Sequence, residues 1–98
     1  MKKTDIQIYV EGIVNDLETA TNDTLIEYFN ESLDVRIEAN INREYLGCMV
    51  AITLGGPNVY LNSHGKIKGS WGIEKYETYV SDTVKEALFD WGYELWEM

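Results

Sequence analysis

The sequence predicts an α+β fold, a two-layer sandwich in which two N-terminal helices and one C-terminal helix cover an antiparallel sheet of three to five strands. Three observations predict it: apolar residues recur with helical spacing at both ends of the chain, they alternate in the middle, and turn residues divide that middle part into short hairpin-linked segments. The 98 residues suffice for one domain with one core, residues 1–98.

The N-terminal third predicts two helices. Thr4 caps the first and forms a capping box with Gln7. Thr21 or Asn22 caps a shorter second helix that ends near Ser32. The inward-facing residues are Ile6, Tyr9, Val10, Ile13, Val14 and Leu17 in the first helix, and Leu25, Tyr28 and Phe29 in the second.

The middle of the chain predicts strands. From residue 35 the apolar period changes to two, which is typical of a strand with one wet face. Its apolar positions are Val35, Ile37, Ala39 and Ile41. After a turn at residues 42–44, residues 46–54 are apolar on both faces, which favours a central place in the sheet.

Two more hairpin-linked strands follow, and a third segment is ambiguous. The Gly55-Gly56-Pro57 turn ends the second strand, and residues 58–62 and 66–72 predict the third and fourth. Gly65 supplies the positive φ of the turn between them. Residues 74–80 fit a short fifth strand and an extended connection equally well.

The last helix carries a row of acids. Ser81 and Asp82 cap it, and its buried face comprises Val84, Ala87, Leu88, Trp91 and Leu95. Asp82, Glu86, Asp90 and Glu94 recur at every fourth position. Each such like-charged pair costs a few tenths of a kcal/mol. The row is either a surface that imitates nucleic-acid phosphates or a solvated face of an acidic protein.

Aromatic residues follow the same helix. Phe89, Tyr93 and Trp96 form a stripe beside the buried face. An exposed stripe of this kind marks a contact surface, whereas a fully wrapped one belongs to the core. The candidate partner-binding residues are therefore Asp82, Glu86, Asp90, Glu94, Tyr93 and Trp96.

Charge limits the partners that we expect. The formal net charge is −9, and residues 45–73 contain two lysines and no acid, so the whole excess lies on either side of them. This balance disfavours direct binding to nucleic acid and to anionic membranes. Lone Cys48 predicts a buried thiol in a reducing cytoplasm, and we expect neither a membrane span nor a signal peptide.

No motif indicates catalysis, so we expect a protein that is not an enzyme and needs no cofactor. His64, the only histidine, lies between turn residues, which favours an exposed turn position over a general base. No cysteine or histidine spacing suits a metal site, and the Gly55-Gly56-Pro57 segment lacks the Lys-Ser/Thr of a phosphate loop.

The segments LGGPNVYLN and KGSWG, within residues 45–73, resemble parts of small phage proteins. Together with small size, acidity and an α+β frame, they give a resemblance to phage and prophage anti-defence proteins, notably anti-CRISPR inhibitors. The resemblance implies a stoichiometric inhibitor, in the host cytoplasm, of a bacterial nuclease complex such as an RNA-guided one. Two alternatives remain: a self-associating domain that forms a homodimer, and an immunity protein against a nuclease toxin.

Overall fold

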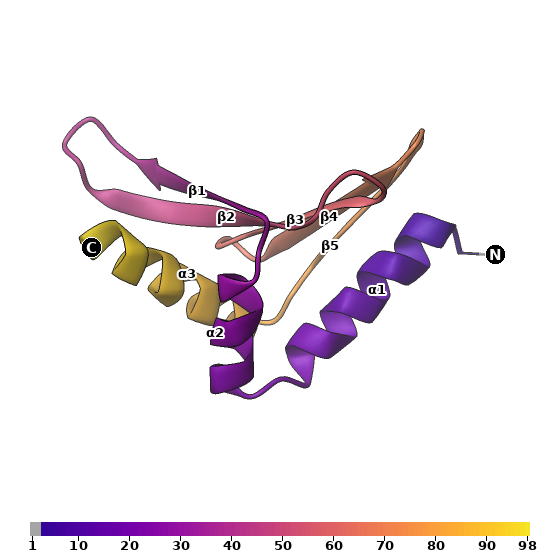
Figure 1. The fold of residues 1–98 in the computed structure, drawn as a ribbon, viewed down its shortest axis with the longest axis horizontal. Coiled ribbons are helices and arrows are strands. Elements are labelled where there is room, and N and C mark those ends of the chain that lie inside the picture. The colour runs from indigo at the N-terminus through magenta and orange to yellow at the C-terminus, as the bar shows by residue number, and fades with distance from the viewer. Residues whose placement is uncertain (1–2) are drawn as a thin grey trace.

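The computed structural model describes residues 3–98 and confirms the predicted α+β fold (Figure 1). Residues 74–79 form a fifth strand, which resolves the ambiguity of the sequence pattern. The helices are α1 (Asp5–Glu18), α2 (Asn22–Asn30) and α3 (Asp82–Glu97), and the strands are β1 (Asp34–Ala39), β2 (Tyr45–Thr53), β3 (Asn58–Asn62), β4 (Lys66–Trp71) and β5 (Glu74–Tyr79).

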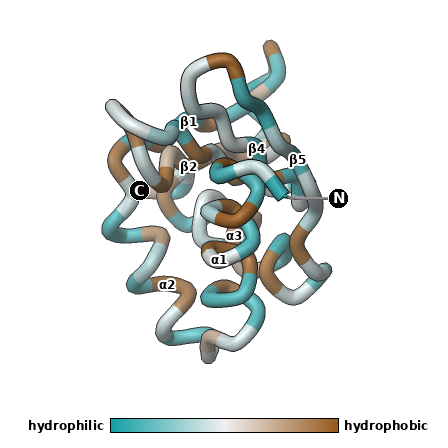
Figure 2. The backbone as a smooth tube through the Cα atoms, turned by 90° about the vertical axis from the view of Figure 1, so that its right-hand side faces the viewer, coloured by the Kyte–Doolittle hydropathy of each residue, from teal (hydrophilic) through white to brown (hydrophobic). Residues whose placement is uncertain are grey.

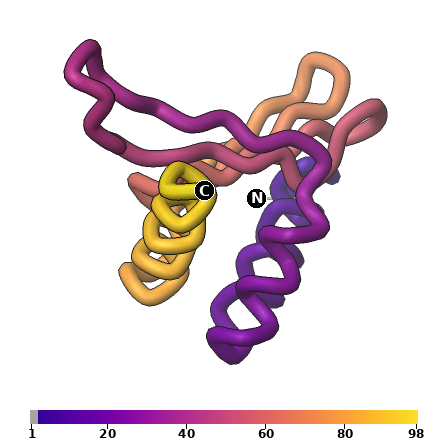
Figure 3. Tube along the Cα trace, turned by 60° about the vertical axis from the view of Figure 1, so that its left-hand side comes forward, coloured from indigo at the N-terminus to yellow at the C-terminus, as the bar shows by residue number. Residues whose placement is uncertain are grey.

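The five strands form an antiparallel meander in chain order. β2 is paired on both sides, as its two apolar faces predict, but the middle strand of the sheet is β3. All three helices lie on one side of the sheet (Figures 1 and 3). α1 packs against β4 and β5, α3 packs against β2, and α2 contacts α3.

The core fills the space between the helices and the sheet. Hydrophobic and hydrophilic segments alternate along the helices, as amphipathic helices on a sheet require (Figure 2). Gly69 of β4 lets α1 approach closely, because a Cβ atom there would lie 2.5 Å from Val10 Cγ2. The largest fully buried side chains are Phe29, Ile6, Leu17, Leu61, Ile67, Leu88, Val10, Val50, Val59 and Val84.

Three details of the sequence prediction are wrong. Ile41 is 97% exposed, because β1 ends at Ala39 and Asn40 Oδ1 closes the following turn by accepting from two backbone N–H groups. Two residues assigned to the inward faces of helices are exposed: Tyr9 of α1 is 38% exposed, and Leu95 is 37% exposed because the buried part of α3 ends at Gly92.

The third error concerns the cap of α1. Thr4 Oγ1 does accept from the Gln7 backbone N–H at 3.2 Å. The Gln7 amide, however, donates to Glu11 Oε1 at 3.1 Å and does not complete a reciprocal capping box.

Candidate protein-interaction surface on helix α3

Hydrogen bonds at both ends of its buried stretch fix the orientation of α3. Ser81 caps the helix by accepting from the Val84 backbone N–H at 3.4 Å. The Glu18 carboxylate at the end of α1 accepts from the Ser81 hydroxyl at 2.7 Å and from its backbone N–H at 3.2 Å. Farther along, Trp91 Nε1 donates to Asn30 Oδ1 of α2 at 2.9 Å. These bonds determine which side chains of α3 face solvent.

A glycine brings α3 close to β2. A Cβ atom at Gly92 would overlap Cys48 Sγ and Tyr45 Oη. The Cys48 thiol donates to the Leu88 carbonyl at 3.4 Å, and the Tyr45 hydroxyl donates to the Phe89 carbonyl at 2.9 Å. Burial raises the pKa of both the thiol and the phenol. The predicted buried cysteine is confirmed, and the Tyr45 ring is held against the side of α3.

All four acids of the predicted row are exposed on α3. Successive members are separated by about 6 Å along the axis and by about 40° around it, so the row winds by about 120° from Asp82 to Glu94. Asp82 Oδ1 lies 3.5 Å from Lys85 Nζ. No basic side chain of residues 3–98 pairs with Glu86, Asp90 or Glu94, which therefore carry the uncompensated charge of the row.

The aromatic stripe is partly exposed and forms one patch with a residue of the sheet. Phe89, Tyr93 and Trp96 are 37%, 46% and 36% exposed. The Tyr45 ring centroid lies 4.8 Å from that of Phe89 and 5.6 Å from that of Tyr93. We call Tyr45, Phe89, Tyr93 and Trp96 the α3 aromatic patch. Tyr45 was not among the predicted site residues, since only the packing of α3 on β2 places it there.

Charge is divided between the layers of the molecule. The three helices contain eleven acids and one base, whereas the five strands contain four of each. In the sequence, the acidic residues lie in two segments on either side of residues 45–73. In the fold, the helices of both segments form a single negatively charged layer. The α3 aromatic patch lies at the border of that layer.

The turn that contains the only histidine has the predicted form. His64 is exposed in the β3–β4 turn, where its backbone N–H donates to Asn62 Oδ1 at 3.0 Å, and Gly65 has the predicted positive φ of 94°. Within residues 3–98, no three His, Cys, Asp or Glu side chains gather to form a metal site. In the same part of the chain, no helix has the length and apolar character needed to cross a membrane.

Comparison with known proteins gives no relative to argue from. No family model matches the chain, and no curated protein or solved structure shows significant similarity to it. Function is therefore argued from the charge and geometry of the molecule.

Proposed function

We propose that the protein is a non-enzymatic inhibitor that binds a basic nucleic-acid-binding surface of a bacterial nuclease or defence complex, in the manner of an anti-CRISPR protein. The observation that carries the proposal is the charge of the helical layer, with eleven acids and one base on α1, α2 and α3. A surface built to accept phosphates attracts such a layer and excludes most neutral or basic proteins.

The acids and the aromatic patch have different tasks in this proposal. Carboxylates at Glu86, Asp90 and Glu94 attract the target over long range and accelerate association. Desolvation of the Tyr93 and Trp96 side chains in the complex supplies most of the affinity, since partly exposed aromatics are typical hot spots. The protein acts in the cytoplasm of the host cell and performs no chemical step.

A pull-down from bacterial lysate tests the proposal. At low salt, the immobilised protein should capture a nucleic-acid-binding enzyme, and either high salt or added duplex DNA should release it. The double variant Asp90→Lys/Glu94→Lys should bind the purified enzyme at least about tenfold more weakly. Equal binding by the wild type and this variant would refute the role of the row.

A matched control separates local from net charge. Asp23→Lys/Glu27→Lys on α2 changes the net charge by the same amount as the α3 variant. If the α3 row makes the contact, the α2 variant should retain most of the affinity. If both variants lose affinity equally, only the overall charge of the helical layer matters, and the assignment of the site to α3 is wrong.

The exposed aromatic patch also favours a second candidate, a homodimer formed through α3. Light scattering distinguishes the two functions. A dimer whose stability does not depend on salt and is lost in Tyr93→Ala/Trp96→Ala would favour self-association. A monomer with a salt-sensitive partner favours the inhibitor, and the identity of that partner separates a defence complex from a nuclease toxin.

A further inference from the structure

The face of the sheet opposite the helices is open. The strand register places alternate residues on this face, among them the cross-strand pairs Arg36–Met49 of β1 and β2 and Lys68–Glu77 of β4 and β5, which form a row in each half of the sheet. No helix within residues 3–98 covers either row (Figure 3). In Figure 1 both ends of the sheet rise away from the helices, which makes this face concave along the strands.

This face collects the basic residues that the helices lack. All four bases of the strands point to it, and three strand acids share it. On β3–β5 the balance is three lysines to one glutamate. The bases are Arg36, Lys66, Lys68 and Lys75, and the acids are Asp34, Glu38 and Glu77.

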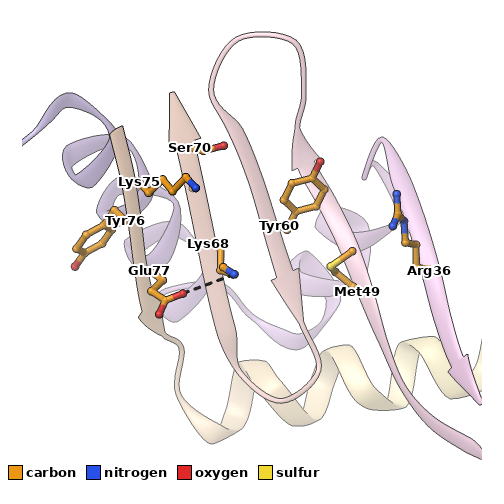
Figure 4. Close-up of a pocket in the computed structure, with 9 residues that line it drawn as sticks. Arg36, Met49, Tyr60, Lys68, Ser70, Lys75, Tyr76 and Glu77 are labelled. Atoms are coloured by element: carbon orange, nitrogen blue, oxygen red, sulfur yellow. Dashed lines mark ion pairs between the residues drawn. The ribbon is translucent and has the colours of Figure 1, made fainter. Parts of the chain in front are cut away.

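The concave face contains a hollow of ≈ 640 Å³. Figure 4 shows Tyr60 and Met49 in its middle, Arg36 on the β1 side, and Lys68 and Lys75 on the opposite side. The Glu77 carboxylate lies 3.9 Å from Lys68 Nζ, a long, half-exposed ion pair of little stability. Lys75 has no ion-pair partner among residues 3–98.

A second aromatic ring lies on the same face beside the hollow. Tyr79 of β5 is 65% exposed, and Lys66 Nζ lies 5.8 Å from its ring centroid. The register pairs Lys66 with Tyr79 and Lys68 with Tyr60, so each of the two rings lies beside a lysine of β4. Aromatic rings interleaved with cations on an antiparallel sheet are the features that bind unpaired bases and their phosphates.

We propose that the open face of the sheet binds single-stranded nucleic acid. Bases stack on the exposed faces of Tyr60 and Tyr79, and Arg36, Lys68 and Lys75 contact the phosphates. This inference does not rest on the α3 proposal, because its residues lie on the other side of the sheet. It also departs from the expectation, drawn from the net charge, that the protein does not bind nucleic acid directly. The basic residues that such binding requires are gathered on one face.

The spacing of the basic residues across the sheet favours a single strand of nucleic acid over a free nucleotide as the ligand. From β1 to β5 the sheet spans four intervals of about 4.8 Å, or about 19 Å, which one nucleotide cannot bridge. A duplex buries its base faces and offers nothing to stack on the tyrosines. The helical acids lie at least about one helix diameter, or 10 Å, from the open face, which exceeds the Debye length of about 8 Å at physiological salt, so the salt weakens their repulsion.

Fluorescence anisotropy with labelled oligo(U) and oligo(dT) of about 12 nucleotides, within the range that single-strand sites occupy, tests this proposal. The wild-type protein should bind at least one of them more tightly than a duplex of equal length, with an affinity that falls as salt rises. If no single strand binds at physiological salt, where the repulsion of the helical acids is screened, or if the duplex or polyglutamate binds equally well, the proposal is wrong.

Substitutions on the open face give effects of opposite sign. Tyr60→Leu should weaken binding about tenfold, whereas Tyr60→Phe should retain it. Lys68→Gln/Lys75→Gln should reduce the slope of log affinity against log salt by about 1.4. Glu77→Gln should tighten binding, a gain that a damaged fold would not produce.

Lys85→Gln is the matched control for the single variant Lys68→Gln, because each removes one lysine and Lys85 lies on α3, on the other side of the molecule. The affinity of the Lys85→Gln variant for the single strand should equal that of the wild-type protein. A loss as large as that of the Lys68→Gln variant would mean that net charge alone governs binding, and would overturn the assignment to the sheet. The Asp90→Lys/Glu94→Lys variant should still bind the single strand even if it no longer binds a protein target.

Discussion

Gly69 shows how one residue fixes the distance between the layers. It lies in β4 directly beneath α1, where a Cβ atom would come within 2.5 Å of Val10 Cγ2 and 2.9 Å of Ile6 Cδ1. Both neighbours are completely buried. A side chain at this position would therefore push α1 away from β4 and β5 and open the core.

We expect Gly69→Ala to lower the free energy of unfolding by about 1–3 kcal/mol, as overpacking does. Gly12→Ala is the control, since its Cβ would meet nothing within 4 Å on the exposed face of α1. That change should raise stability by up to about 1 kcal/mol, because alanine favours a helix. Urea denaturation measures both, and equal effects would contradict the close packing at Gly69.

The buried Cys48 and the partly buried Tyr45 should make the fold sensitive to alkali. Burial raises both pKa values in the folded state, so each protonated group contributes stability fully below its unfolded pKa, about 8.5 for a thiol and 10 for a phenol. This contribution is lost as the pH rises further. The free energy of unfolding should fall above about pH 8.5, and less steeply in the Cys48→Ala variant. A pH-independent difference between the two proteins would contradict this.

At the scale of elements, α3 depends on the polar contacts at its start. Ser81 caps the helix and also donates to Glu18, so that one residue joins the end of α1 to the beginning of α3. The hydrogen bonds between Ser81 and Glu18 also help to determine which face of α3 is turned to solvent. Their loss should therefore affect stability and the presentation of the acidic row together.

Ser81→Ala should cost about 1 kcal/mol of stability, the usual effect of removing an N-cap. Urea denaturation measures the loss. Thr4→Ala is the comparison, because Thr4 also caps a helix through the backbone N–H three residues on but has no second partner in another helix. A smaller effect at Ser81 than at Thr4 would mean that the bonds to Glu18 contribute nothing.

Local patterns predicted the elements well. The caps Thr4 and Ser81 and the positive φ of Gly65 follow from neighbouring residues, and the structure has all three. Of the two candidate caps for the second helix, Thr21 and Asn22, the structure has Thr21. The pattern at residues 74–80 was ambiguous because a strand there depends on pairing with β4, which is a tertiary contact.

The site could be predicted only in part. The exposure of Asp90 follows from helical spacing, and the structure agrees, whereas the spacing left open whether Tyr93 is exposed or wrapped. The Tyr45 ring joined the patch without a sequence signal, because Gly92 lets two segments far apart in the chain meet. The open basic face was missed because net charge averages over surfaces that the fold separates.

The whole molecule has two chemically different sides. The helical layer is strongly acidic, and the open face of the sheet holds all the bases of the strands. The core separates the helices from the open face of the sheet, so we expect each side to bind its proposed partner independently. The acidic side is complementary to the basic surface of a nucleic-acid-binding protein. The basic, aromatic side is complementary to single-stranded nucleic acid.

If the acidic helices occupy the nucleic-acid-binding surface of the target enzyme, the protein must compete with DNA for that surface, and displacement of labelled duplex DNA from the captured enzyme measures this competition. We predict that the protein releases the DNA completely at about one equivalent per site, and that the Asp90→Lys/Glu94→Lys variant does so at least about tenfold less effectively. If the target holds the duplex and the protein at the same time, the acidic helices do not occupy the nucleic-acid surface and the account is contradicted.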